Sequence, residues 1–484
     1  MTSLEKLIID KGPFLSGELI EILTGGDNPI SNEAARKRIS RLSESIYKIR
    51  GLFADGQILF HDKEIFGTEE YYSGLNNALK KSGKQYYTIL KALDFHNGYI
   101  KSNQLAAYSV NPVDKIKGHL IFETALKNLL KIGLVHIDDE HTAISNHLAD
   151  GGLSFNRAKG VEVAKNFLLA QFNDWSRKIG LVSYNSSKFH TLFGGYQFNF
   201  VAPSYVGSLI KKTSESIVPA FVIADVLIGN VINKEQVDFF ISKVAALKQR
   251  KGLAKFIPFL IVDSIDTKAL NSLKSNGIII GFADELFGDD YKELLNSLIN
   301  LITNAGAILK KNPEAYLDLI SKLNKLVDGK TNNLRGDLFE LAVGYYQGRV
   351  CSNIDMGKHI NYNGNRREID VFGVQTNNVV VCECKGYNQQ VSEAEIKIWL
   401  EEKVPVIRKW ILDTGAYSDK KIEFQFWSTG GFTTDAMTLL DKRKQNKNKY
   451  ILEYFDLNKM LEKSKEMNSK KFTEILREYY VKEI

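Results

Sequence analysis

Apolar side chains recur with helical spacing in the first part of the chain, in residues 3–10 and again in the segment SGELIEILT. A third helical pattern follows Ser31, whose hydroxyl can cap a helix. Two β-rich runs then flank Asp55 and Gly56, a pair that favours a hairpin turn. Residues 1–75 are therefore predicted to form three helices followed by a β-hairpin.

Residues 76–150 show a weaker version of the same order. Three helical patterns, the last of which ends in a strand, lie in GKQYYTILKALDFHNG, KSNQLAAYS and HLIFETALKNLLKIGLVHID. Three helices and a hairpin are the elements of a winged helix-turn-helix domain, so both segments resemble that family, whose third helix enters a DNA groove. The third helix of the second segment is apolar around much of its circumference, which favours packing over DNA contact.

The third helix of the first segment is the candidate DNA-reading helix. Four cations project from the side opposite its apolar face: Arg36, Lys37, Arg38 and Arg41. We expect them to contact phosphates, because Lys and Arg displace the counterions of duplex DNA. The alternative is a solvated basic helix in a small protein-interaction domain, since residues 1–80 are not basic as a whole.

Residues 151–330 change to an alternation of strands and helices. Buried strands are predicted in AFVIADVLIG, KFIPFLIVDS and IIIGFADELFG, and the intervening helices in NKEQVDFFISKVAALKQRKG and TKALNSLKSNG. This alternation indicates an α/β domain.

The C-terminal segment RREIDVFGVQTNNVVVCECKGY contains two strand-like runs around a polar turn cluster, residues 375–378. If those four residues form the loop, Val374 pairs with Val379, and Asp370 falls opposite Glu383. Lys385 joins the same face because strand side chains alternate with period two, whereas the two cysteines of this strand point the other way. The register thus predicts three charged side chains on one face.

Two carboxylates at that separation repel each other unless a cation lies between them. Asp370 and Glu383 offer hard oxygen ligands, which suit Mg²⁺, with Mn²⁺ as the substitute ion. Lys385 beside such an ion can orient water and stabilise the negative charge that develops on a phosphate.

This constellation resembles the PD-(D/E)xK nuclease superfamily, which has the restriction-endonuclease-like fold. The motif is carried by Ile369 and Asp370, then by Glu383, Cys384 and Lys385. Ile369 stands where the name-giving proline would be. The resemblance covers about residues 331–460, and it implies a catalytic role for Glu340 on the preceding helix NNLRGDLFELAVGYY, an Mg²⁺-dependent cut and a nucleic-acid substrate, usually DNA. The alternative is a surface hairpin with a structural Glu–Lys ion pair, because D-x(12)-E-x-K is a short pattern.

The sequence of the middle segment is also similar to that of the C-terminal segment. With a one-residue gap, the alignment matches three positions: Glu162 with Glu340, Asp225 with Glu383, and Leu227 with Lys385. If this is a duplication, the middle domain has lost its lysine and is expected to be inactive. Chance similarity between two α/β units is the alternative.

Further basic residues lie near the candidate site. Arg366 and Arg367 precede Asp370 and are expected to contact phosphate. Gln389 and Gln390 could touch substrate, but two glutamines in a loop are more often only solvated. The run DKRKQNKNKY at 441–450 fits phosphate contact and an exposed, solubilising turn equally well.

Composition limits the classes of protein and of binding partner that fit this chain. The net charge of +7 over 484 residues permits nucleic acid as a partner without requiring it. The 3 cysteines lack CxxC spacing and the 8 histidines lack HxxxH or HxH spacing, so neither disulfides nor zinc is indicated. DGKT at 328–331 lacks the glycine and the strand of a phosphate-binding loop. The start MTSLEKLIIDKG is not a signal peptide, and no stretch could span a bilayer, so we expect a cytoplasmic protein without a membrane partner.

These patterns predict an α/β multidomain protein in four parts. Two winged-helix units at 1–75 and 76–150 precede a degenerate nuclease-like domain at 151–330 and a nuclease domain at 331–484. The predicted activity is Mg²⁺-dependent DNA cleavage, in restriction or anti-phage defence with possible protein partners, by a homodimer because two strands need two sites. The alternatives are a non-catalytic winged-helix DNA-binding regulator or scaffold, and a nuclease for RNA or branched DNA.

Overall fold

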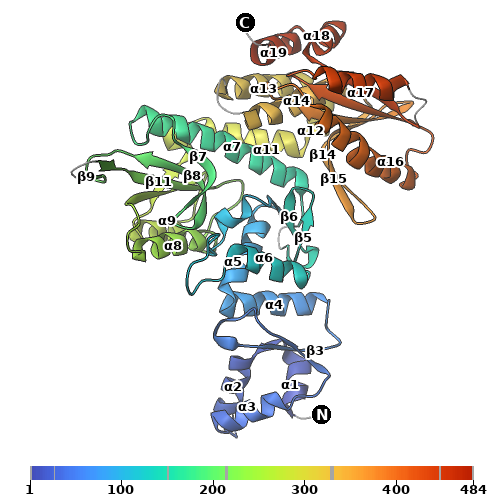
Figure 1. Cartoon of the computed structure of the whole chain (residues 1–484). Helices are drawn as coiled ribbons and strands as arrows, with labels where there is room; N and C mark the ends of the chain where they lie inside the picture. The colour runs from blue at the N-terminus through green and yellow to red at the C-terminus, as the bar shows by residue number, and fades with distance from the viewer. Residues whose placement is uncertain are drawn as a thin grey trace.

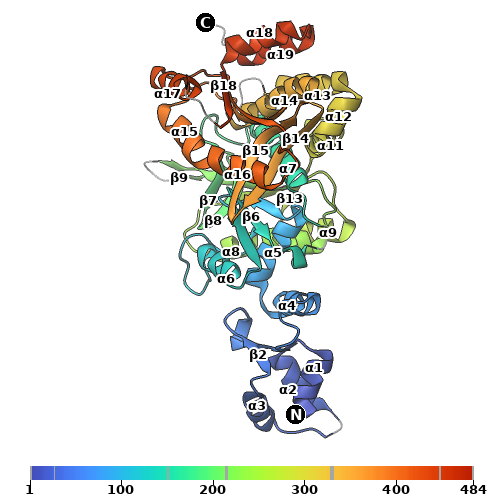
Figure 2. The ribbon, with the colours of Figure 1, turned by 90° about the vertical axis from the view of Figure 1, so that its right-hand side faces the viewer.

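The structure is a computed structural model that describes residues 3–26, 28–149, 152–212, 216–327, 332–445 and 449–481. It is a mixed α/β protein built from several units. Figures 1 and 2 show an elongated molecule, with the N-terminal unit at one end and the C-terminal helices at the other. The DGKT segment lies outside the described residues, as does part of the basic run at 441–450. No helix within the described ranges is long and apolar enough to cross a membrane.

The N-terminal unit contains the predicted three helices and hairpin. Its elements are α1 (Ser3–Lys11), β1 (Phe14–Leu15), α2 (Ser16–Gly25), α3 (Asn32–Ser40), β2 (Ile46–Ile49) and β3 (Leu59–Asp62). Ser31 caps α3 by accepting a hydrogen bond from the backbone N–H of Ala34, as its position predicted. Asp55 and Gly56 both adopt left-handed φ angles, but they lie in a longer loop between Ile49 and Leu59, not in a two-residue turn.

The second unit repeats this order of elements. After α4 (Glu69–Ser82) come α5 (Lys84–Phe95), β4 (Tyr99–Lys101), a 3₁₀ helix (Leu105–Tyr108), α6 (Phe122–Lys131), β5 (Val135–Asp138) and β6 (His141–Ile144). The sheet order β4-β6-β5 matches β1-β3-β2 of the first unit. The segment KSNQLAAYS was predicted as a helix, but it is helical only over the 3₁₀ turn Leu105–Tyr108. The apolar residues of this turn are buried between α5 and β8.

The middle unit is built around a five-stranded sheet in the order β13-β12-β11-β8-β7. The long helix α7 (Phe155–Lys178) precedes the strands and helices β7 (Lys188–Phe193), β8 (Tyr196–Ser204), β9 (Lys211–Lys212), β10 (Ile217–Val218), β11 (Ala220–Leu227), α8 (Lys234–Gln249), β12 (Phe256–Val262), α9 (Thr267–Ser275) and β13 (Ile279–Phe282). The predicted alternation of strands and helices is present. Strand β11 is nearly fully buried, as a strand covered on both faces requires.

Helices link this sheet to the C-terminal one. They are α10 (Ala283–Phe287), α11 (Tyr291–Thr303), α12 (Ala305–Lys311), α13 (Pro313–Val327) and α14 (Asn332–Val350). Helix α7 packs against α11, α14, β4, β11 and β14, so it contacts the second, middle and C-terminal units at once. One hydrophobic core, which includes residues of both sheets, runs along it.

The C-terminal unit has a second five-stranded sheet, ordered β14-β15-β16-β17-β18. Its elements are β14 (Asn353–Tyr362), β15 (Asn365–Val374), β16 (Asn378–Lys385), α15 (Glu393–Ile398), a π-helical turn (Trp399–Lys403), α16 (Val404–Asp413), β17 (Lys421–Ser428), α17 (Thr434–Gln445), β18 (Ile451–Phe455), α18 (Leu457–Glu466) and α19 (Lys470–Tyr480). Val374 pairs with Val379, which confirms the predicted register.

The two five-stranded sheets have the same topology. In each, a long helix precedes an antiparallel hairpin, the third strand is antiparallel to the second, and the last two strands are parallel to the third. β7, β8, β11, β12 and β13 therefore correspond in order to β14, β15, β16, β17 and β18.

Candidate active site

The candidate site lies where the hairpin strands β15 and β16 separate. Their paired residues run from Val374 and Val379 to Val371 and Cys382. The next rung would join Asp370 and Glu383, as the predicted register requires. Instead, the Asp370 carboxylate accepts a hydrogen bond from the backbone N–H of Cys384 at 2.7 Å. A buried side chain thus replaces a backbone rung, and this contact fixes the position of the carboxylate.

Glu383 is held by two lysines. The Nζ of Lys385 lies 2.9 Å from Glu383 Oε1, and the Nζ of Lys403 lies 2.9 Å and 3.1 Å from its two carboxylate oxygens. Lys385 comes from the same face of β16, as predicted. Lys403 ends the π-helical turn, a local distortion that often accompanies functional sites. Glu383 is 5% exposed, whereas the two lysine side chains are 29% and 27% exposed and reach solvent.

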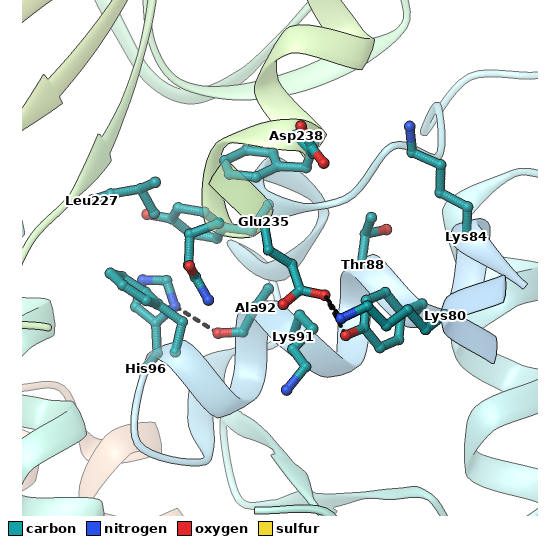
Figure 3. Close-up of a pocket in the computed structure, with 14 residues that line it drawn as sticks. Lys80, Lys84, Thr88, Lys91, Ala92, His96, Leu227, Glu235 and Asp238 are labelled. Carbon is teal, nitrogen blue, oxygen red and sulfur yellow. Dashed lines mark hydrogen bonds and ion pairs between the residues drawn. The ribbon is translucent and has the colours of Figure 1, made fainter. Parts of the chain in front are cut away.

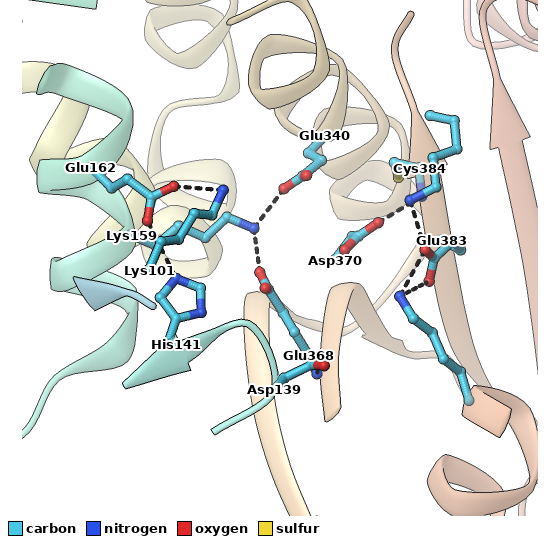
Figure 4. Close-up of polar contacts among 12 residues, drawn as sticks. Lys101, Asp139, His141, Lys159, Glu162, Glu340, Glu368, Asp370, Glu383 and Cys384 are labelled. Carbon is cyan, nitrogen blue, oxygen red and sulfur yellow. Dashed lines mark hydrogen bonds and ion pairs between the residues drawn. The ribbon is translucent and has the colours of Figure 1, made fainter. Parts of the chain in front are cut away.

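Glu340 lies on α14, and Figure 4 shows it pointing toward the same region as Asp370 and Glu368. Lys159 of α7 donates to Glu340 Oε2 at 2.8 Å and also pairs with Glu368, which lies two residues before Asp370 on β15. A cation of the middle unit therefore reaches into the carboxylate cluster of the C-terminal unit.

Three carboxyl groups in and beside the cluster, those of Asp337, Glu340 and Asp370, resist ionisation. Burial, together with the charge of the Glu383 carboxylate, raises the pKa of Asp370 to about 6. Burial likewise raises the pKa of Glu340 to about 8 and that of nearby Asp337 to about 7, against the opposing effect of lysines. Burial also acts on Glu383, but Lys385 and Lys403 hold its pKa below the usual value. These raised pKa values indicate too little positive charge for the number of carboxylates, which a divalent cation with oxygen ligands would supply.

The predicted nucleic-acid contacts lie in two separate places. The four cations of the candidate DNA-reading helix are exposed on α3, while Ala35 and Ile39 of the same helix are buried. This face lies at the far end of the molecule from the carboxylate cluster (Figure 1). Arg366 lies 3.6 Å from Asp138 of the second unit, and Arg367 donates to the backbone oxygen of Arg366. Both arginines are half-buried, and their expected contact with phosphate stays a prediction.

Three charged residues of the site were missed by sequence reasoning. Glu368 shares the face of Asp370 at period two, so the strand pattern could have identified it. Lys403 depends on the π-helical turn and Lys159 on contact between two units, and neither feature leaves a local pattern in the sequence.

The middle sheet carries an equivalent but altered site. The pairing of β8 and β11 ends at Phe200 and Ala224, one rung before Asn199 and Asp225. Asn199 Oδ1 accepts from the backbone N–H of Val226 at 3.0 Å, the same contact that Asp370 makes with Cys384. Asn199 thus stands at the place of Asp370, and Asp225 at the place of Glu383.

The remaining positions of the middle site are also altered. Leu227 stands where β16 has Lys385, and Lys243 of α8 contacts Asp225 at 2.6 Å, as Lys403 contacts Glu383. Lys243 and Asp225 have fully buried side chains, so solvent does not reach this pair. Glu162 turns to Lys101 and His141 of the second unit, at 2.8 Å and 3.3 Å.

A separate cavity of about 260 Å³ lies between α5 and α8 (Figure 3). Its polar lining includes Lys80, Lys84 and Glu235, and Lys80 pairs with Glu235 at 3.0 Å across the two units. None of the residues that line it belongs to the carboxylate cluster. The ion pair across this cavity links the second and middle units.

The chain matches no protein-family model and no curated protein. Two solved structures of the restriction endonuclease FokI are similar to it. The DNA-bound structure is 12% identical, with 61% of this chain and 68% of that chain covered and a TM-score of 0.17. The other is 11% identical, with 95% and 84% covered and a TM-score of 0.21. At these TM-scores the similarity carries no argument about function, which rests on the geometry of the site.

Proposed function

We propose that this chain is a metal-dependent nuclease that hydrolyses phosphodiester bonds in DNA. The observation that carries the proposal is the interrupted β15–β16 ladder, which brings Asp370 and Glu383 together beside the solvent-reaching Lys385. The raised pKa values of Asp370 and Glu340 support it, because such carboxyl groups ionise readily only when a cation is supplied. Mg²⁺ is the proposed ion, with Mn²⁺ as its substitute.

Asp370 and Glu383 would hold the ion, and Glu340 would add a third carboxylate to the site from α14. The bound ion would neutralise the carboxylates and polarise the phosphate that is cut. The hydrogen bond from Cys384 keeps Asp370 oriented without the ion. Orientation in advance is what a catalytic ligand needs, because no reorganisation is then required during the reaction.

Lys385 would act on the reacting phosphate. Although burial lowers it, Glu383 and Asp370 raise the pKa of Lys385 above the usual value, so the side chain stays charged at physiological pH. A charged lysine donates hydrogen bonds and stabilises negative charge, but it does not accept a proton. We therefore assign Lys385 to the developing charge of the phosphate and to the orientation of the attacking water.

Lys403 and Lys159 would balance the carboxylates when no metal is bound. Lys403 contacts both oxygens of Glu383, and Lys159 contacts Glu340 and Glu368. Metal binding would then compete with these lysines, which predicts that they turn toward phosphate oxygens once the ion is present.

We assign the other units to binding and support. The order α1-β1-α2-α3-β2-β3 and its repeat in the second unit support two winged-helix modules, of which the first presents the basic face of α3 to DNA. The middle unit is proposed to be a degenerate duplicate, because Asn199, Asp225 and Leu227 stand at the positions of the C-terminal site. It would serve as a spacer or dimerisation platform in a restriction or anti-phage defence protein that acts as a homodimer, with or without protein partners.

Two other functions remain as alternatives for the experiment. A non-catalytic DNA-binding regulator has no need for an Asp, a Glu and a Lys together in the C-terminal sheet. The middle sheet, which lacks two of these residues, shows that the framework does not require them. A nuclease for RNA or branched DNA would use the same catalytic residues, so only the substrate distinguishes it.

The test is to incubate the purified chain with plasmid, single-stranded DNA, branched DNA and RNA, in EDTA, Mg²⁺ or Mn²⁺. The proposal predicts cleavage of duplex DNA that requires either ion and stops in EDTA. Preferential cleavage of RNA or branched DNA would change the proposed substrate but leave the proposed catalytic site unchanged. Binding of DNA without cleavage of any substrate in either ion would favour the regulator.

A further inference from the structure

A second cluster of possible metal ligands shares Glu368 with the carboxylate cluster but contains none of the proposed catalytic residues. His141 of β6, His359 of β14 and Glu368 of β15 each place one ligand atom within 4.8 Å of the other two. The residues come from two units that are far apart in the sequence. Histidine spacing could not reveal the cluster, because its two histidines belong to different units.

Each histidine of this cluster has a carboxylate on one side of its ring. His141 Nε2 lies 3.3 Å from Glu162 Oε2, and His359 Nδ1 lies 3.2 Å from Asp138 Oδ2. A histidine that binds a metal commonly donates its other ring N–H to a carboxylate, which fixes the tautomer and the ring orientation. The His141 imidazole is therefore oriented as a metal ligand is, and the His359 imidazole lies within ion-pair distance of Asp138 without a hydrogen bond to it.

The opposite nitrogen of each ring is buried without a partner. Among the residues that the structure describes, His141 Nδ1 and both ring nitrogens of His359 have no hydrogen-bond partner. His141 is only 4% exposed, His359 is partly buried, and the ring of Phe155 packs against both imidazoles. A buried ring nitrogen without a hydrogen bond costs free energy, and a metal ion would satisfy both nitrogens at once.

We propose that His141, His359 and Glu368 bind a divalent transition-metal ion of the Zn²⁺ type. Two imidazoles and one carboxylate form a ligand set that suits zinc, with water or a further oxygen as the fourth ligand. Ligands of a tetrahedral zinc ion lie about 3.3 Å apart, so closure of the site needs shifts of about 1.5 Å at most. Lys159 contacts Oε1 of Glu368, and Oε2 is the atom that would turn to the ion.

This ion would fasten the second unit to the C-terminal sheet. His141 lies in the small sheet of the second unit, whereas both other ligands lie on the β14–β15 hairpin that carries Asp370. The contact of Asp138 with His359 also joins the second unit to the C-terminal sheet. The contact of Glu162 with His141, shown in Figure 4, joins α7 to the second unit. The proposal does not depend on nuclease activity, since it concerns different ligands and a softer ion.

The test is a titration of the chelator-treated full-length chain with Co²⁺, a spectroscopic substitute for Zn²⁺, in excess Mg²⁺ that saturates sites built from oxygen ligands. The wild type should bind one equivalent, with the visible absorption of cobalt in a low-coordinate nitrogen and oxygen site, and Zn²⁺ should displace it. His141→Gln and His359→Gln should each weaken binding by more than about tenfold, since loss of an outer partner alone can cost that much.

Two controls separate this site from others. His119→Gln removes an exposed histidine outside the cluster and should leave cobalt binding unchanged. Asp370→Asn should also leave it unchanged, because Asp370 belongs to the proposed Mg²⁺ site. A wild-type chain that binds no Co²⁺ in excess Mg²⁺ would overturn the proposal without any variant. Folded His141→Gln and His359→Gln chains that bind as the wild type does would overturn it as well.

Discussion

At the scale of single residues, Asp370 and Glu383 are both buried, but their pKa values shift in opposite directions. Burial and the charge of Glu383 raise the pKa of Asp370 to about 6, whereas Lys385 and Lys403 hold the pKa of Glu383 below its usual value in spite of burial. The two lysines therefore compensate only one of the two carboxylates. Of these two carboxylates, Asp370 is therefore the one that gains more from a metal ion and that destabilises the protein more without one.

This asymmetry predicts how Asp370→Asn changes stability with pH. In the unfolded chain Asp370 ionises near its ordinary pKa of 3.8, but in the folded chain it keeps its proton until about pH 6. A raised pKa of an acid stabilises the folded protein at low pH, and this contribution is lost as the pH rises from about 4 to about 6. Without metal, Asp370→Asn should therefore be more stable than the wild type at pH 7, by up to about 3 kcal/mol.

Urea unfolding in EDTA at several pH values from 4 to 8 measures this difference. The asparagine can still accept the hydrogen bond from Cys384, as Asn199 accepts one from Val226. The advantage of the variant should vanish near pH 4, and Mg²⁺ should stabilise the wild type alone. A variant less stable than the wild type at pH 7 in EDTA would show that Asp370 is a structural ion-pair partner.

At the scale of elements, one face of α3 packs in the N-terminal core and the opposite face is proposed to bind DNA. Ala35 and Ile39 are buried in the N-terminal core, whereas the four cations of this helix point outward. Replacement of Arg36, Arg38 and Arg41 by alanine should therefore leave the fold intact. If α3 contacts DNA, each lost phosphate contact should flatten the slope of log affinity against log salt by about 0.9.

The measurement is duplex binding at several salt concentrations, with a matched control. Lys251, Lys268 and Lys274 are exposed lysines of the middle unit, and their replacement by alanine removes the same charge elsewhere. The α3 variant should lose affinity and slope, and the control should keep both. Equal effects of the two variants would show that net charge, and not α3, governs binding.

The elements also show what could be predicted from the sequence. The register of β15 and β16 follows from the turn residues and from the period of two, which together fix which side chains share a face. The helix expected in KSNQLAAYS is shortened to the 3₁₀ turn Leu105–Tyr108, which packs between α5 and β8. Lys403 and Lys159 could not be predicted, since the first depends on a π-helical turn and the second on the packing of α7 against another unit.

At the scale of the whole molecule, two sheets of one topology carry two differently preserved sites. The C-terminal site keeps Asp370, Glu383 and Lys385, and its lysines reach solvent. In the middle sheet Asn199 and Leu227 replace two of these residues, and the ion pair between Asp225 and Lys243 is fully buried. The same framework is thus compatible with catalysis in one sheet and with a closed core in the other.

The central claim is that only the C-terminal site cuts DNA, and plasmid cleavage in Mg²⁺ by two variants tests it most directly. Lys385→Ala leaves Lys403 paired with Glu383, so the protein should fold and bind DNA but cut at least about a hundredfold more slowly.

The matched variant changes the middle site. Asp225→Asn combined with Lys243→Met removes both buried charges together, because removal of one alone would cost about 3–5 kcal/mol. This double variant should cut plasmid at the wild-type rate. Cleavage that survives Lys385→Ala, or that disappears in a folded Asp225→Asn, Lys243→Met chain, would contradict the account.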